Sequence, residues 1–300
     1  MQVPAYPIPN LADVAESVRQ GRCILFLGAM ASAPSPAGCP YTYRTAPPGG
    51  AELSRRLARA CNYPYDDTWN LLRVSLYYQI QTSRSRLVEA IQREITGCNA
   101  PDGTGRIEYD PSPALHMLAA LPFPIIITTN YDRLFDRALK RALTLDGREK
   151  DPIVKVYNPD GAPEYVTLDP SERNPVLLKL HGDIENRDSI VVTEEDYLCF
   201  IEKMSNEKEH PIHLNIRSRI NTWPVLFIGY SLKDYNLRLL YRTMRWYLDP
   251  ATLPLSYSID PYPDQLIVSI FQEMVRFVED DLWKFVPALY EAVTGRAYPP

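Results

Sequence analysis

Residues 23–32 read Cys-Ile-Leu-Phe-Leu-Gly-Ala-Met-Ala-Ser, an apolar run that ends in a glycine. A run that is apolar on both faces is typical of a strand buried in a parallel sheet with helices on either side. Three later runs have the same form: 125–127 before Thr-Thr-Asn-Tyr-Asp, 176–178 before Lys-Leu-His-Gly-Asp, and 225–228 before Gly-Tyr-Ser. Together they predict a parallel sheet that brings glycine or polar residues to one edge.

Helical patterns alternate with these runs. Ser112 and Pro113 are typical of a helix start, residues 132–143 continue as a helix, and Thr193 with Asp196 gives a capping-box pattern. Strands that alternate with helices predict an α/β fold, here Rossmann-like and doubly wound, with a mainly parallel sheet. We also expect strands at Val154, at 190–192 and near Ser256 and Val275, a helix capped by Asp234 and running to about Tyr247, and a last helix from Asp280.

Residues 50–97 are wholly helical in pattern. Apolar pairs one helical turn apart mark three helices, namely Leu53 with Leu57, Leu72 with Leu76, and Leu87 with Ile91. We expect a small helical module inserted at the rim of a single domain that spans residues 1–300. The polar, glycine-bearing segment 98–111 is expected to be an exposed loop.

The composition excludes several classes of protein. The chain has 300 residues, 45% hydrophobic and 23% charged, which are ordinary values for a globular protein. A net charge of −5 argues against an electrostatic nucleic-acid binder. The five cysteines are scattered with no Cys-x-x-Cys pair, so no zinc ribbon or dithiol redox motif is expected. We find no secretory signal and no apolar stretch near the ~20 residues that span a bilayer, so we expect a cytoplasmic protein.

Glycine is scarce, with 13 residues against 28 prolines. A glycine directly after an apolar run is therefore a candidate for a backbone position that approaches another group closely. Gly28 to Ser32 lies where α/β folds bind ligand phosphates against backbone N–H groups. The segment is neither a G-x-G-x-x-G fingerprint nor a P-loop, so a plain tight turn is the alternative.

The other three strand ends carry candidate chemistry. An amide and a carboxylate at Asn130 and Asp132 can face one cleft, unless Asn130 caps the following helix. His181 closes a strand where a general base would be mounted, although a lone histidine is often a structural residue. Gly229 and Ser231 follow the fourth strand, where a simple turn is again the alternative.

The ordered set Gly-Ala-Met-Ala-Ser, Thr-Thr-Asn-Tyr-Asp, Leu-His-Gly-Asp and Ile-Gly-Tyr-Ser-Leu resembles the sirtuin-like family. It looks most similar to the bacterial sirtuin-like domains of anti-phage defence, which cleave NAD, and the similarity extends over about residues 10–290. The family carries Gly-Ala-Gly in the first motif, whereas Met30 stands in the third place here. The four-cysteine zinc module of sirtuins has no counterpart, which argues against protein deacylation.

The resemblance implies roles for single residues. Asn130 would contact the nicotinamide ribose and help to place the attacking water, His181 would act on a ribose hydroxyl, and Asp132 would hold the carboxamide. The other NAD-binding residues that it implies are Gly28, Ala29, Ser32, Thr129, Gly229 and Ser231. No metal is expected, because cleavage of the nicotinamide–ribose bond proceeds by positioning and electrostatics.

The function expected from the resemblance is an NAD glycohydrolase that depletes NAD in abortive infection, an antiviral defence. An NAD-dependent protein deacylase and a non-catalytic nucleotide-sensing subunit are the alternatives; Met30 keeps the second open. Unrestrained activity would kill the host, so we expect a homo-oligomer, a regulatory partner such as an ATPase or nuclease subunit, or both. We expect no direct contact with nucleic acid or membrane, and a trigger on another polypeptide.

Overall fold

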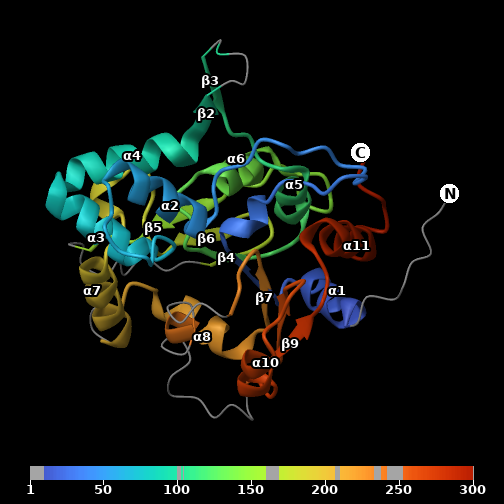
Figure 1. The fold of residues 1–300 in the computed structure, drawn as a ribbon. Helices are drawn as coiled ribbons and strands as arrows, with labels where there is room; N and C mark the ends of the chain where they lie inside the picture. Colours follow the sequence, from blue (N-terminus) through green and yellow to red (C-terminus); the bar gives the residue numbers. More distant parts are fainter. Residues whose placement is uncertain are drawn as a thin grey trace.

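The fold is built on a parallel sheet. The computed structural model describes residues 10–99, 103, 105–159, 169–206, 210–232, 238–241 and 253–299. Within these residues the main sheet has the order β5-β6-β4-β1-β7-β8-β9, and every pairing is parallel (Figure 1). Its strands are β1 (Ile24–Leu27), β4 (Ile125–Thr128), β5 (Ile153–Val156), β6 (Val176–Lys179), β7 (Val225–Ile228), β8 (Ser256–Ile259) and β9 (Val275–Val278). The predicted α/β fold with a mainly parallel sheet is confirmed.

The strand order reverses next to β1. The chain passes from β1 to β4 and outwards, then returns from β6 to β7 on the other side of β1. Ligands of open α/β sheets bind beyond the carboxyl ends of the strands at such a switch point. In the register, Leu27 pairs with both Thr128 and Ile228, and Thr128 pairs with Lys179. The turns after these four strands therefore start at one level of the sheet.

Helices cover both faces of the sheet, as the doubly wound fold requires (Figure 1). Successive strand residues point to opposite faces, so Leu25 and Ile126 join one hydrophobic cluster and Phe26 and Ile127 the other. The first cluster includes α1 (Leu11–Arg19), α5 (Pro113–Ala120), α6 (Leu134–Arg141) and α11 (Leu282–Thr294). The second includes α7 (Glu194–Ser205), α8 (Leu214–Thr222) and α10 (Gln265–Phe271).

The three helices predicted within residues 50–97 are present. They are α2 (Gly50–Ala60), α3 (Leu71–Gln81) and α4 (Arg84–Thr96). Their buried side chains form a third cluster, which also takes in Ile184, Ile190 and Val192 from the segment after β6. The helical module thus packs on the chain that leaves the His-Gly-Asp motif.

Two of the expectations for single segments are wrong. Residues 190–192 are buried but belong to no strand: Ile190 and Val192 pack against the helical module, and Val191 packs in the second cluster. The segment 98–111 is not a loop throughout, since β2 (Gly97–Asn99) and β3 (Arg106–Glu108) pair as an antiparallel hairpin that projects at the top of Figure 1. Asp234 and the expected helix end near Tyr247 lie outside the described residues, although 238–241 are helical.

The helix starts predicted at Ser112 and at Thr193 are confirmed. The Ser112 hydroxyl accepts a hydrogen bond from the backbone N–H of Leu115, with Pro113 in the first turn of α5. Thr193 and Asp196 form a reciprocal capping box at the start of α7. These polar contacts explain why both helix starts could be found in the sequence.

Candidate active site

The turns after β1 and β7 touch backbone to backbone. The N–H of Gly28 donates to the carbonyl of Ile228 at 2.9 Å, and that of Met30 donates to Gly229 at 3.1 Å. A Cβ on Gly28 would lie 2.4 Å from the Gly229 oxygen. Gly229 has a φ of +76°, and a Cβ there would lie 2.0 Å from the nitrogen of Ala31. Gly28 and Gly229 are therefore both required to be glycine. The backbone N–H groups of Gly28 and Met30 are used in hydrogen bonds within the protein.

The segment after Gly28 forms a short 3-10 helix, η1 (Ala29–Ser32). Met30 is 54% exposed, with Sδ 3.0 Å from the place where a Cβ on Gly49 would lie. Its side chain therefore points away from the contact between the two glycines, and the turn accommodates a residue other than glycine. Ser32 is buried at the end of η1, whereas Ser231 is exposed beyond β7. The two predicted serines thus lie in different environments.

Asn130 joins the end of β4 to the β1 turn. Its side-chain Nδ2 donates to the carbonyl oxygen of Gly28 at 3.1 Å, and its backbone N–H donates to Oγ1 of Thr128 at 3.0 Å. Asn130 is not the cap of α6, because that helix begins at Leu134 and the Leu134 N–H donates to Oδ1 of Asp132 at 2.9 Å. The capping alternative for Asn130 is wrong.

Tyr230 links the β4 and β7 turns across β1. Its hydroxyl lies 2.5 Å from Oγ1 of Thr129 and accepts a hydrogen bond from the Thr129 N–H at 3.1 Å. The ring packs edge-on against Phe26, with ring centroids 5.1 Å apart. Sequence reasoning placed Tyr230 within its motif but gave it no role. The sequence signal that could have indicated a role for Tyr230 was an aromatic residue directly after a strand-end glycine.

His181 leaves β6 at the level where Asn130 leaves β4, since each lies two residues past the pair formed by Lys179 and Thr128. The imidazole packs edge-on against Phe200, with centroids 5.2 Å apart. Its Nε2 is buried with no hydrogen-bond partner among the described residues. Burial lowers the pKa of His181 to about 4, so the ring is neutral at pH 7. His181 is therefore not a structural histidine with all its hydrogen bonds satisfied, which was the alternative to a general base.

Gly182 lets the chain turn away directly after His181. Its φ is +90°, and a Cβ there would lie 2.2 Å from the carbonyl oxygen of Ser189. The returning segment then bonds to the site, because the Val191 N–H donates to the His181 carbonyl at 3.0 Å and the Tyr131 hydroxyl donates to the Val191 carbonyl at 2.8 Å. The positions of residues 130–132 and of His181 are thus linked.

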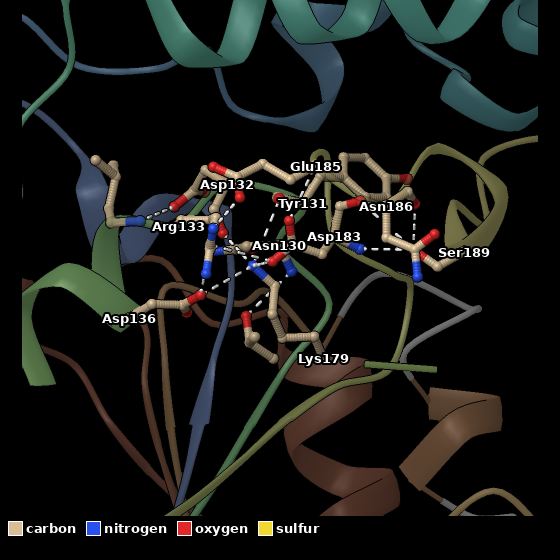
Figure 2. A network of polar contacts seen from close by, with 12 residues as sticks. Asn130, Tyr131, Asp132, Arg133, Asp136, Lys179, Asp183, Glu185, Asn186 and Ser189 are labelled. Carbon is tan, nitrogen blue, oxygen red and sulfur yellow. Dashed lines mark hydrogen bonds and ion pairs between the residues drawn. The ribbon is translucent and has the colours of Figure 1, made fainter. Parts of the chain in front are cut away.

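A buried ionic network lies next to the β4 turn (Figure 2). Lys179 is fully buried, with Nζ 2.9 Å from Asp183 Oδ2 and 3.8 Å from Asp136 Oδ2. Arg133 contacts the same two carboxylates at 3.2 Å from Asp136 and 3.6 Å from Asp183. Burial raises the pKa of Asp132, and the positive charge of Lys179 partly opposes that rise. Sequence reasoning missed Lys179, whose signal was a lysine in an apolar strand four residues before an aspartate.

The described residues contain neither a metal-binding cluster nor a membrane-spanning helix. No three His, Cys, Asp or Glu side chains gather there in a way that could hold a metal ion. No helix in the same residues combines the length and apolar character that crossing a bilayer requires.

Comparison with known proteins finds relatives named as an NAD(+) hydrolase and as a defence-associated sirtuin. The chain is 30% identical over 132 residues to NAD(+) hydrolase ThsA of Enterococcus faecium, a match that covers 44% of this chain and 24% of that protein. It is 27% identical over 270 residues to Defense-associated sirtuin 2 of Bacillus subtilis, covering 88% of this chain and 23% of that protein. The matches thus span about a quarter of the length of these relatives.

A solved structure from work on the structural basis for the mechanism and regulation of Sir2 enzymes also matches. It has 14% sequence identity and a TM-score of 0.42, and the match covers 95% of this chain and 98% of that chain.

A family model described as a SIR2-like domain matches residues 124–273, which are half of the chain. The matched part contains Asn130, Asp132, His181 and Gly229, which all follow strands of the central sheet. The resemblance drawn from the sequence motifs is therefore confirmed: this chain belongs to the SIR2-like family.

Proposed function

We propose that this domain is an NAD glycohydrolase, which cleaves the bond between nicotinamide and ribose and releases nicotinamide and ADP-ribose. Membership of the SIR2-like family and relatives named NAD(+) hydrolase support the proposal. The observation that carries it is the neutral imidazole of His181, whose buried Nε2 has no hydrogen-bond partner among the described residues, two residues past the end of β6, as Asn130 lies two residues past the end of the neighbouring β4.

The chemistry asks for positioning more than for covalent participation. Nicotinamide leaves as a neutral molecule while positive charge develops on the ribose, and water then attacks the same carbon. A protein promotes such a step by holding the ribose and the water in place and by stabilising the developing charge. Fixed polar groups at the ends of neighbouring strands suit this task because they need not reorganise during the reaction.

In this proposal Asn130 orients the ribose and the water. Its Nδ2 is held by the carbonyl of Gly28, so the amide plane is set before substrate binds. Its Oδ1 is then directed away from that bond and can accept a hydrogen bond from water. Asp132 would receive the N–H groups of the nicotinamide carboxamide, which prefer a carboxylate acceptor.

His181 would take the proton of a ribose hydroxyl, the resulting oxyanion would take the proton that the attacking water loses, and His181 would release its proton to solvent. An imidazole must be neutral to take the hydroxyl proton, and its lowered pKa keeps it neutral over the physiological range. The turns that contain Gly28, Ala29, Gly229 and Ser231 would bind the phosphates and the adenosine half. Gly28 and Met30 bond to the β7 turn through their backbone N–H groups, so the dinucleotide would be recognised there by other groups.

We further propose that the protein depletes NAD in defence, as a homo-oligomer or together with a regulatory partner. The name of one relative, Defense-associated sirtuin 2, supports the defence role. A cell can tolerate an enzyme that consumes NAD only when assembly or a partner restrains it, which supports external control.

The test is nicotinamide release from NAD by the purified protein, alone and with the products of neighbouring genes. Wild type should release nicotinamide, and His181→Ala should lower the rate by roughly 10³-fold, as expected for a lost general base and a lost contact. His116→Ala on α5 is the matched control and should keep the wild-type rate, since His116 lies outside the four strand-end turns.

Three outcomes would contradict the proposal. NAD binding without any product would indicate a sensing subunit. Release that requires an acylated lysine peptide would indicate a deacylase. An unchanged rate in His181→Ala would remove His181 from the reaction.

A further inference from the structure

Lys179 has a setting that the proposed reaction does not use directly. It is the last residue of β6, a strand whose residues are all buried. Its own exposed fraction is 0%, so its charge has no contact with water. A buried ammonium is strongly unfavourable unless anions and hydrogen-bond acceptors surround it. The contacts of Lys179 therefore show which groups compensate its charge.

The ammonium contacts both carboxylates and backbone. Besides Asp183 and Asp136, Nζ donates to the carbonyl of Asp132 and, at 3.5 Å, to that of Tyr131. In Figure 2 its side chain lies beneath the turn that carries Asn130 and Asp132. Lys179 therefore bonds to the backbone of the turn itself and to Asp183, two residues past His181.

The same turn is fixed on its opposite side by the β1 strand end. There the Thr128 hydroxyl donates to the Leu27 carbonyl at 2.8 Å, and Asn130 donates to Gly28. These contacts hold the start of the turn, whereas Lys179 holds its end. Without Lys179 the carbonyls of Tyr131 and Asp132 would lose a charged donor, and Asp132 would lose the cation that opposes the rise in its pKa.

Lys150 offers a comparison within the same protein. It is also buried, at 6% exposed, and its Nζ donates to the carbonyls of Ala119 at 2.8 Å and Leu121 at 2.7 Å. Those carbonyls close the end of α5, away from the four strand-end turns. Lys150 thus has the burial and the carbonyl contacts of Lys179 without its place next to the site.

We propose that Lys179 is a positioning residue for NAD cleavage: its ammonium holds the Asn130–Asp132 turn in register with His181. The inference rests on the proposed function, because it assigns Lys179 to that reaction. Lys179 is shielded from substrate and acts only through the turn. A displacement of about 1 Å of reacting groups lowers rates by roughly 10²-fold, which sets the size of the expected effect.

The test compares Lys179→Met with Lys150→Met, each of which replaces a buried ammonium by an apolar chain of similar length. Folded fraction is measured by thermal unfolding, NAD affinity by calorimetry, and kcat and KM by nicotinamide release. Lys179→Met should lower kcat per folded molecule by roughly 10²-fold, with the dissociation constant for NAD within about threefold of wild type. Lys150→Met should lower the unfolding temperature and keep kcat per folded molecule.

Loss of the ammonium leaves Asp136 and Asp183 buried with less compensation, so Lys179→Met can fail to fold. The variant Lys179→Met/Asp183→Asn removes one carboxylate with the ammonium and is measured in that case, against Asp183→Asn alone. The double variant should be slower than Asp183→Asn, because the turn carbonyls still lack their donor. Equal kcat values in the two Asp183→Asn proteins, or in Lys179→Met and wild type, would overturn the assignment.

A second readout separates this inference from the proposed function. Hydrogen exchange of peptides that cover 129–136 and 182–192 reports the order of both turns without any substrate. Faster exchange there in Lys179→Met, together with no nicotinamide release by wild type, would refute the proposed NAD glycohydrolase activity. It would leave only the conclusion that Lys179 orders the two turns. Unchanged exchange would refute the positioning role whether or not wild type is active.

Discussion

The two halves of the sheet edge are built by different means. On the β1 and β7 side, two turns approach so closely that Gly28 and Gly229 must lack side chains, and backbone hydrogen bonds join them. On the β4 and β6 side, side-chain charges join the segments that follow the strands: the buried Lys179 and the partly exposed Arg133 each contact both Asp136 and Asp183. The first half should be sensitive to volume, and the second to charge and pH.

The largest effect expected on the first half comes from Gly229→Ala. Its Cβ would overlap the backbone nitrogen of Ala31 at 2.0 Å, and an alanine also disfavours the φ of +76°. Backbone cannot yield as a flexible side chain does, so we expect a loss of more than about 3 kcal/mol in unfolding free energy, measured by urea titration.

Gly38→Ala is the matched control. Gly38 has a φ of +82°, but a Cβ there would have nothing within 4 Å, so only the conformational cost of about 1 kcal/mol applies. Equal losses in the two variants would mean that close approach contributes nothing at Gly229.

Asn130 bridges the two halves, and Asn130→Ala should separate stability from turnover. The lost hydrogen bond to Gly28 lowers stability by about 1 kcal/mol. Nicotinamide release should fall by roughly 10²- to 10³-fold, as for loss of a preorganised polar group. Asn174→Ala is the control, because it removes an amide that is hydrogen-bonded to Asp151 away from the site. It should change neither the rate nor the NAD affinity. A loss of rate equal to that of Asn130→Ala would argue against a special role for Asn130.

The charged half should carry much of the pH dependence. His181, in this half, has a pKa lowered by burial to about 4, against 6.5 in an unfolded chain, and the same holds for His210, which lies before α8 and outside this half. Between these values the unfolded chain binds protons that the folded chain refuses, so stability falls as pH is lowered from 6.5 to 4. We expect His181 to contribute on the order of 2 kcal/mol to this fall.

Chemical unfolding at several pH values measures that dependence. His181→Gln should flatten the curve between pH 6.5 and 4. A parallel curve for His181→Gln would show that its imidazole is not protected from protons.

Met30→Ala should have the smallest effect. The side chain is 54% exposed and turned away from the contact of the glycines, so stability should change by no more than about 0.5 kcal/mol. Thermal unfolding checks this. A loss of several kcal/mol would place Met30 inside the volume-sensitive half.

The sequence predicted the elements whose signals are local. Apolar runs indicated the central strands, and side-chain caps indicated α5 and α7. It did not predict α8, whose cap is the imidazole of His213 instead of a hydroxyl, amide or carboxylate. It also placed a strand at 190–192, because burial under a helical module and burial in a sheet produce the same apolar letters.

For the site, the sequence located the strand-end motifs but not how they are held. Asn130 could be named from its position, yet its bond to Gly28 joins residues 102 apart in the chain. The spacing of Lys179 and Asp183 is visible in the sequence, but the contacts of Lys179 with Asp136 on α6 and with the carbonyls of Tyr131 and Asp132 join distant parts of the chain. The charges around the site interact through contacts between residues that are distant in the chain, and a single sequence does not show which distant residues are in contact.

The segment after Gly182 belongs to two structures at once. Ile184, Ile190 and Val192 share the core of α2, α3 and α4, while Val191 bonds to His181 and Tyr131. A load applied to the helical module is therefore transmitted to the imidazole through a short stretch of backbone. The outer helices and the histidine share this one segment, so a substitution in the core of the helical module should also change the surroundings of His181.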